Sequence, residues 1–388
     1  MRDVWIVGAG MSPFGVFPDL GVKELGAMAC LRALKDAAVK PNQVEMVYCG
    51  NAAAGVLSPQ GTTVTQVILR EVGITGIPML RVENACASGA TAINQAWLAV
   101  ASGFVDVVLV LGVEKMTGAP RPKVFEYMAS ASDVELEGAM GLTMPGVFAM
   151  IARRHMQEFG TTREQIAKVA VKNHANGALN PSAHFRKPIS VEDVLKAPVV
   201  AHPLTLLDCC PVTDGAAAVV LASRATADRL GKRSVKLAAT ALRSGTYADN
   251  LDLTSFEVTV RAARKAYEQA GIGPEDVDLA EVHDCFTIAE IVHYEDLGFC
   301  KKGEGGGLID RGETAIDGRL PTNASGGLKA KGHPVGATGV AQVVEIVEQL
   351  RGDAGPRQVR DAKVGLTHCL GGFMHGDACA VGVTILHR

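Results

Sequence analysis

Short apolar runs alternate with amphipathic stretches along the first part of the chain. The runs at residues 4–10, 44–50, 78–84 and 105–112 are rich in Val, Ile and Leu and predict strands. The segments at 23–38 and 63–72, and the stretch that Cys86 opens, have the residue spacing of helices. Strands that are apolar at successive positions are typical of a parallel sheet covered on both faces. This part of the chain therefore predicts a layered α/β structure.

The pattern is interrupted after residue 112. No clear period follows until the helices expected at 147–159 and 163–177, and the excursion ends near His202. Because a connection of this length is usually functional, we expect an inserted loop domain that covers a site. The strand-like run at 214–223 then returns to the earlier pattern.

A second alternation of the same kind begins near residue 236. It predicts strands at 235–242, 277–284, 362–369 and 378–386, and helices at 257–270, at 287–298 and after His333. The turns "ENACASGATA" and "NASGGLKAKGHPVGATG" hold corresponding places in the two series, which indicates an internal duplication whose pseudo-twofold packing would bring both turns to one centre. We therefore divide the chain into a first half (1–117, continued at 203–235), the inserted loop domain (118–202) and a second half (236–388).

Composition and charge narrow the class of protein. The 388 residues are 48% hydrophobic and carry a formal net charge of −3, which argues against a nucleic-acid-binding surface. The nine cysteines contain no C-x-x-C spacing, so neither a disulfide framework nor a zinc knuckle is indicated. The sequence contains neither an apolar run of membrane-spanning length nor a signal-peptide pattern. We expect a cytoplasmic protein that binds neither nucleic acid nor membrane.

Four segments combine a reactive side chain with a tight turn of small residues: Cys86 in "NACASG", His283 in "EVHDCF", His333 in "KGHPVGATG" and Cys369 in "THCLGGF". Cys86 stands where a helix starts, and the free backbone N–H groups and the helix dipole there favour a thiolate. Neighbouring glycines leave backbone N–H groups free to bind an oxyanion. Two cysteines and two histidines at such turns suit thiol chemistry.

Other interpretations of these residues remain open at this point. Cys86 and Cys369 could be small buried hydrophobes, and His283 could be a structural histidine at a strand end. A metal site made from the four residues is disfavoured, because no pair has the close spacing of structural zinc ligands, and we expect no metal. Cys209 and Cys210 are expected in a strand, on opposite faces, as structural residues. "VGAGMSPFG" lacks the third glycine of a dinucleotide-binding loop.

Together the four segments resemble the thiolases, and within them the sterol-carrier-protein-2-type and archaeal–bacterial branch. "NACASG" matches the nucleophile block, "GGLKAKGHPVGATG" the G-H-P block and "CLGG" the C-x-G-G block, in the order of the family and over essentially the whole chain. "LTLLDCCPVTDGAAAVVLAS", "KNHANGALNP" and the H-D-C-F at 283–286 are similar to this branch in particular, since common thiolases have N-E-A-F there. The resemblance implies the thiolase fold: two similar α/β halves, each βαβαβαββ, in α/β/α/β/α layers.

The resemblance also implies a role for each reactive residue. Cys86 would attack a thioester and hold the acyl group, while His333 would take the proton of Cys86 and then help bind a thioester oxygen. Cys369 would be the acid/base that moves the proton of the acetyl methyl or of the leaving thiol. His283 would contribute to the oxyanion hole for the enolate. The backbone N–H groups of Cys86 and Gly371 would form a second hole, for the tetrahedral intermediate.

Further residues are implied to bind the substrate. Phe286 would line the acyl pocket, and Phe373 follows "CLGG" where many thiolases have another glycine, which narrows the space beside the hole. Cationic residues of the loop domain are candidates for binding the phosphates of coenzyme A: Arg121, Lys123, Arg153 and Arg154. No cofactor is expected beyond the substrate coenzyme A.

The expected function is an acyltransferase of lipid metabolism that makes or cleaves a 3-oxoacyl-CoA, either acetoacetyl-CoA or a longer one. Its expected partners are acyl-CoA and CoA, a second copy or more in a homodimer or homotetramer, and, as in some relatives, a small zinc-ribbon/OB-fold protein. One alternative is another condensing enzyme of the same fold, but those use a single cysteine, so Cys369 argues against it. The other alternative is a non-catalytic acyl-CoA-binding subunit of a larger complex.

Overall fold

The computed structural model describes residues 1–231, 233–247 and 252–388. Among these residues, nine strands form one sheet in the order β3-β2-β4-β7-β1-β8-β11-β10-β9. The first half of the chain supplies the strands β1 (Val4–Met11), β2 (Met46–Gly50), β3 (Met79–Val82), β4 (Val107–Glu114) and β7 (Gly215–Ser223). The second half supplies β8 (Val235–Ser244), β9 (Leu279–Glu281), β10 (Val364–Gly371) and β11 (Ala380–His387). The two groups of strands join where β1 pairs with β8.

The sheet is mixed, so the expectation of a parallel sheet in the first half is wrong in part. Strand β2 is parallel to β3 and β4, and β9 is parallel to β10, whereas β7 runs antiparallel to both β4 and β1. All nine residues of β7 are buried. A run of apolar residues indicates that both faces of a strand are buried. It does not indicate whether the strand runs parallel or antiparallel to its neighbours.

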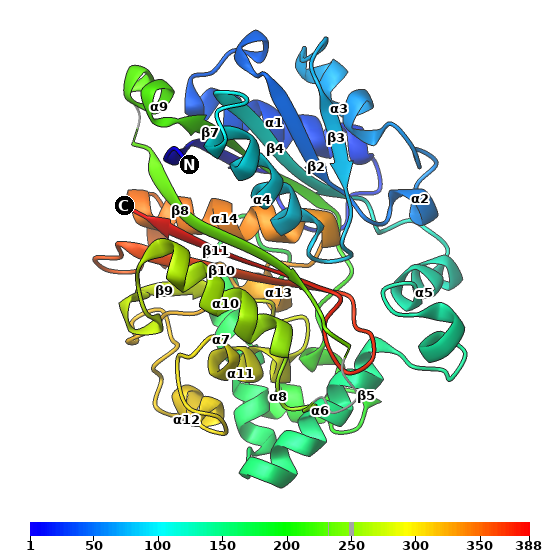
Figure 1. The fold of residues 1–388 in the computed structure, drawn as a ribbon. Helices are drawn as coiled ribbons and strands as arrows, with labels where there is room; N and C mark the ends of the chain where they lie inside the picture. Colours follow the sequence, from blue (N-terminus) through cyan, green and yellow to red (C-terminus); the bar gives the residue numbers. More distant parts are fainter. Residues whose placement is uncertain (232, 248–251) are drawn as a thin grey trace.

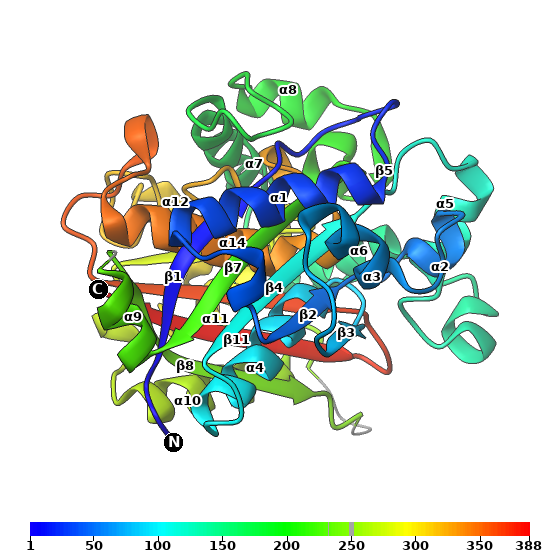
Figure 2. The ribbon, with the colours of Figure 1, turned by 90° about the horizontal axis from the view of Figure 1, so that it is seen from above.

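Helices lie in three layers around the sheet (Figure 1). Helices α4 (Ser88–Ala101) and α14 (Val335–Arg351) pack against each other and contact strands of both halves, so they form the central layer. All residues of α14 except Glu348 and Arg351 are buried. Helices α1 (Val22–Ala37) and α3 (Val64–Val72) cover the other face of the first half, as Figure 2 shows. Helices α10 (Glu257–Ala270) and α11 (Thr287–Asp296) belong to the outer core of the second half, which confirms the layered α/β arrangement.

The excursion between β4 and β7 is mainly helical and lies beside the second half (Figure 1). It contains α5 (Arg121–Ala129), α6 (Met144–Phe159), α7 (Arg163–Ala178), α8 (Val191–Lys196) and the short strands β5 (Val199–Ala201) and β6 (Leu204–Thr205). Helix α7 begins with a reciprocal cap, in which the Thr162 hydroxyl accepts the Gln165 N–H and the Gln165 side chain accepts the Thr162 N–H. Helix α5 was not expected, because Tyr127 is its single buried residue and no apolar stripe marks it.

The remaining helices are short: α2 (Ala54–Leu57), α9 (Arg224–Leu230), α12 (Gly305–Asp310) and α13 (Gly327–Ala330). Cys209 and Cys210, expected in a strand, instead follow a 3-10 turn at Leu206–Asp208. Over the described ranges, no helix combines the length and the apolar character needed to cross a bilayer.

Candidate active site

An apolar cavity of about 190 Å³ lies between the helical excursion and the ends of the second-half elements. Cys86, His283 and His333 line it, together with residues of α5 and α6. The structure thus brings three of the four predicted reactive residues to one wall, and the fourth, Cys369, lies buried directly behind them. Because residues of α5 and α6 line the cavity, the excursion covers it, as we expected for the inserted loop domain.

Cys86 projects from a tight turn that precedes α4. Ala85 adopts a left-handed conformation (φ 47°), and the Ser88 hydroxyl closes the turn by accepting the Asn84 N–H (2.9 Å) and donating to the Ala85 carbonyl (2.6 Å). Burial raises the pKa of the Cys86 thiol to about 12, and the nearby Glu114 carboxylate acts in the same direction. These effects outweigh the helix N-terminus, so the resting group is a thiol that needs a base.

His333 has the geometry of that base. Its Nδ1 lies 2.7 Å from the Thr338 hydroxyl oxygen, and that hydroxyl donates its own proton to the Pro334 carbonyl (3.0 Å). Nδ1 must therefore carry the ring proton, which leaves a lone pair on Nε2. Nε2 is buried and has no hydrogen-bond partner among the residues that the structure describes. Burial lowers the pKa of His333 to about 3, so the ring is neutral at rest.

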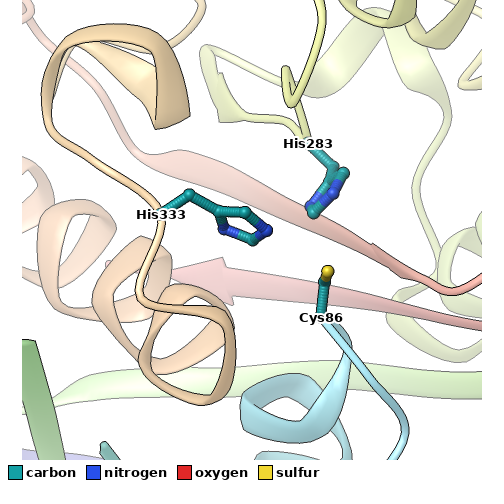
Figure 3. A group of neighbouring side chains, drawn as sticks. All are labelled: Cys86, His283 and His333. Atoms are coloured by element: carbon teal, nitrogen blue, oxygen red, sulfur yellow. The ribbon is translucent and has the colours of Figure 1, made fainter. Parts of the chain in front are cut away.

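The His283 ring stands nearly perpendicular to that of His333, with 5.1 Å between the centroids. The Cys86 sulfur and one ring nitrogen of each histidine all lie within 4.8 Å of one another, and Figure 3 shows both rings directed towards the sulfur. Burial, and then the neighbouring His333 and His368, lower the pKa of His283 well below its usual value. The group is therefore a neutral thiol beside two neutral imidazoles.

Cys369 completes the group from β10. Its thiol donates to the Cys86 carbonyl (3.1 Å), and its sulfur lies 3.8 Å from His283 Nδ1. Burial raises the pKa of the Cys369 thiol well above its usual value. Because the Cys369 thiol lies within hydrogen-bond reach of His283 and directly behind Cys86, it can take up and return a proton at this site.

Asp284 ties the two histidine-bearing segments together. It follows His283, and its carboxylate accepts the Leu328 N–H (2.7 Å) in α13, which leads into His333. A β-carbon on Gly327 (φ 57°) would lie 2.4 Å from an Asp284 carboxylate oxygen, so only glycine fits at that position. Burial, together with the neighbouring Glu290, raises the pKa of Asp284.

Glu114, which the sequence analysis missed, joins segments of the two halves through hydrogen bonds. At the end of β4 its carboxylate accepts hydrogen bonds from the N–H groups of Ala52 (2.9 Å), Ala53 (3.1 Å) and Gly336 (3.0 Å) and from the Asn51 side chain (2.7 Å). Burial raises the pKa of Glu114 to about 7. A single acidic residue at the end of the apolar run "VVLVLGVE" is the only sequence signal that could have pointed to it.

Gly371 packs its backbone against the turn that carries Cys86, since a β-carbon there would lie 2.1 Å from the Asn84 carbonyl oxygen. The next residue, Gly372, lines the cavity, and its backbone amide opposes the rise in the pKa of Cys86. Phe286 and Phe373 also line the cavity, and Phe286 stacks on Phe148 with 4.6 Å between the ring centroids.

Three further cysteines line the same cavity, namely Cys209, Cys210 and Cys285. Cys209 and Cys210, expected as structural residues on opposite faces of a strand, instead both line this cavity. Of the cationic candidates, Arg153 and Arg154 line a separate hollow of about 720 Å³ next to His202, and Arg121 and Lys123 are exposed on α5.

A cysteine thiol, an imidazole with a free Nε2 and a second thiol behind them, beside one apolar cavity, are as a class the groups that thiol-based acyl transfer uses. Comparison with known proteins gives the family. The model of the thiolase N-terminal domain matches residues 4–225, and that of the thiolase C-terminal domain matches residues 239–384. The chain belongs to the thiolase family; it is a thiolase and an acyltransferase.

Its relatives include the acetyl-CoA acetyltransferase of Methanothermobacter thermautotrophicus, 48% identical over 99% of both chains. Sterol carrier protein 2 of Bos taurus is 38% identical over 95% of this chain and 70% of that protein. The solved structure of the "Ltp2-ChsH2(DUF35) aldolase" superposes with a TM-score of 0.86 at 27% identity and covers 100% of this chain and 98% of that one. These findings confirm the family that the motifs predicted.

Proposed function

We propose that the protein makes or cleaves a 3-oxoacyl-CoA through an acyl-Cys86 intermediate. The observation that carries this proposal is the free, buried Nε2 of His333 beside the Cys86 thiol, with Cys369 3.8 Å from His283. The 48% identity to an enzyme named acetyl-CoA acetyltransferase supports acetoacetyl-CoA as the 3-oxoacyl-CoA.

Acylation is the first half of the proposed reaction. The Cys86 sulfur attacks the thioester carbonyl while its proton moves to His333 Nε2. The carbonyl oxygen becomes an oxyanion, which the backbone N–H groups of Cys86 and Gly371 would stabilise; their two segments are in direct backbone contact. The tetrahedral intermediate then expels the sulfur of coenzyme A, which takes the proton of the Cys369 thiol and leaves Cys369 as a thiolate, while the acyl group stays on Cys86.

Carbon–carbon bond formation is the second half. Cys369 would remove a proton from the methyl group of a bound acetyl-CoA, and His283 and His333 would stabilise the enolate oxygen. The enolate carbon then attacks the acyl carbon, and the Cys86 sulfur leaves and takes back its proton from His333 Nε2. Because one well-placed donor to an oxyanion is worth roughly 10²- to 10³-fold in rate, each of these contacts matters.

The apolar wall with Phe286 and Phe148 is the proposed acyl pocket. We further propose that the chain works in lipid metabolism in the cytoplasm as a homodimer or homotetramer and that it needs no cofactor beyond coenzyme A. The exposed cationic residues of the excursion are the proposed ligands of the phosphate groups: Arg121, Lys123, Arg153 and Arg154. The name of the superposed aldolase structure joins two proteins, Ltp2 and a DUF35 protein, which supports a small partner protein as a second proposal.

Brief incubation of the purified chain with acetyl-CoA tests the function. Mass spectrometry should find an acetyl group on the peptide of Cys86, and acetoacetyl-CoA should form. The control is Cys209→Ala, which removes another thiol of the same cavity and should leave the adduct in place. Acetylation of a different cysteine, or an unchanged rate in Cys86→Ala, would refute the assignment. An acetyl adduct without condensation would favour dependence on a partner.

A further inference from the structure

The three groups drawn in Figure 3 are also a set of metal-binding atoms. One thiol sulfur and two imidazole nitrogens lie within 4.8 Å of one another. In a tetrahedral zinc site, bonds of about 2.3 Å to sulfur and 2.0 Å to nitrogen place such atoms about 3.3 to 3.6 Å apart. The three atoms would therefore have to approach one another by at most about 1.5 Å for one ion to bind them all.

We propose that Cys86, His283 and His333 bind one Zn²⁺ ion, and that the ion inhibits the enzyme by occupying the nucleophile and its base. Binding is a simple exchange without oxidation: the Cys86 thiol releases its proton to solvent, and the thiolate and two imidazole lone pairs bind the metal. The fourth position faces the cavity, where water or the thiol of coenzyme A can enter.

His333 is prepared for a metal in the way that zinc-binding histidines are. Such a histidine usually donates its second ring nitrogen to an acceptor, which fixes the ring and directs the other lone pair at the ion. Here the acceptor is the Thr338 hydroxyl at 2.7 Å, and the free Nε2 is buried with no partner in the described part of the chain.

The donors also select the kind of ion. Thiolate and imidazole suit Zn²⁺, whereas Mg²⁺ and Ca²⁺ prefer oxygen ligands. No Asp or Glu is among the described residues that line the cavity, and the buried carboxylate of Glu114 is occupied by four hydrogen bonds. We therefore expect Zn²⁺ to bind where Mg²⁺ at the same concentration does not.

Zinc binding can be measured without turnover, so this inference stands or falls separately from the proposed function. The full chain, freed of metal with EDTA and dialysed, is titrated with Zn²⁺ in a calorimeter. Titration with Co²⁺ in a spectrophotometer adds a direct readout, because a thiolate bound to Co²⁺ gives a charge-transfer band. We expect one ion per chain and a band that Zn²⁺ abolishes.

Variants locate the site. Cys86→Ser should weaken Zn²⁺ binding at least 100-fold and remove the band, and Thr338→Val should weaken it roughly 10- to 100-fold, the scale of an outer contact to a ligating histidine. The matched control is Cys210→Ala, which lies on the same cavity wall and should bind Zn²⁺ as the parent does. Thermal melting identifies any variant that is not folded.

Alkylation provides a test that requires no variant. Parent protein treated with iodoacetamide until Cys86 is modified should lose both the Zn²⁺ signal and the Co²⁺ band. Retention of Zn²⁺ binding after alkylation, or in folded Cys86→Ser, overturns the proposal. Loss of binding in Cys210→Ala also overturns it, because the metal would then belong to the cysteines at 209, 210 and 285.

Discussion

Thr338→Val removes a hydroxyl that touches no substrate but fixes the proton of His333. In the parent, the 2.7 Å contact keeps the proton on Nδ1 and leaves Nε2 free to act as the proposed base for Cys86. Valine has nearly the same shape, and the Pro334 carbonyl still accepts the backbone N–H of Ala337 (2.9 Å), so the helix start is preserved. The variant therefore perturbs mainly the tautomer and the orientation of the ring.

The size of the effect follows from the buried N–H group that is left without an acceptor. An unsatisfied buried donor costs about 1–3 kcal/mol, and each 1.36 kcal/mol is a factor of ten in rate, so acylation should slow roughly 5- to 150-fold. Thr338→Ser keeps the hydroxyl and should remain close to the parental rate.

Rapid-quench mass spectrometry of the acetyl adduct on Cys86 measures this acylation rate, and thermal melting reports whether the fold is retained. The rate of Cys86 alkylation by iodoacetamide should fall with it, since both reactions need the same base. If folded Thr338→Val acylates within twofold of Thr338→Ser, the hydroxyl does not set the tautomer, and His333 is not held as described here.

Three other substitutions separate the remaining contacts. Cys369→Ala should still acetylate Cys86 but lose acetoacetyl-CoA formation by about 10²-fold, with exchange of the acetyl methyl hydrogens in heavy water nearly abolished; normal exchange would contradict this role. Gly371→Ala should impair acylation or folding, because its methyl group would meet the Asn84 carbonyl at 2.1 Å, and an unaffected, folded variant would show that the turn can move. Glu114→Gln tests the pH dependence of stability. The fold raises the pKa of Glu114 from the usual 4.5 to about 7, so between these values the native state holds a proton that the unfolded chain has lost. From pH 5 to pH 8 the free energy of unfolding of the parent should therefore fall by about 2–4 kcal/mol relative to that of the variant. Urea unfolding at the two pH values measures it, and equal pH dependence in both proteins would place the titration elsewhere.

Periodicity predicted the elements well where one face or both faces are buried. Helix α10 spans the expected residues 257–270, since it carries a clear apolar stripe. The strand expected at 277–284 is ordered as a strand only over Leu279–Glu281, because the chain leaves the sheet to present His283. Helix α5 has no such apolar stripe, so the periodicity of the sequence did not predict it. The sequence pattern also did not predict which strands pair antiparallel, because pairing depends on strands that are distant in the sequence.

The reactive residues could be found because glycine-rich turns and family motifs mark them. Thr338 and Glu114 could not, because a single polar residue inside an apolar segment has the same appearance whether it orients a catalytic group or caps a turn. Their importance arises from contacts with residues far away, such as the 3.0 Å bond from the Gly336 N–H to Glu114. Sequence reasoning thus identified the candidate reactive residues and missed polar residues that hydrogen-bond to them or to their segments.

The site is shared between the halves in a way that joins chemistry to packing. The first half supplies Cys86, and the second supplies His283, His333 and the Cys369 thiol. Each half also holds reacting groups of the other: the Cys369 thiol donates to the Cys86 carbonyl, and the Gly371 backbone lies against the turn of Cys86. Both contacts join β10 to the turn of Cys86, so the two halves together position Cys86 relative to Cys369. Both halves contribute strands and helices to the layers, and the candidate site arises only where Cys86 of the first half meets His283, His333 and Cys369 of the second.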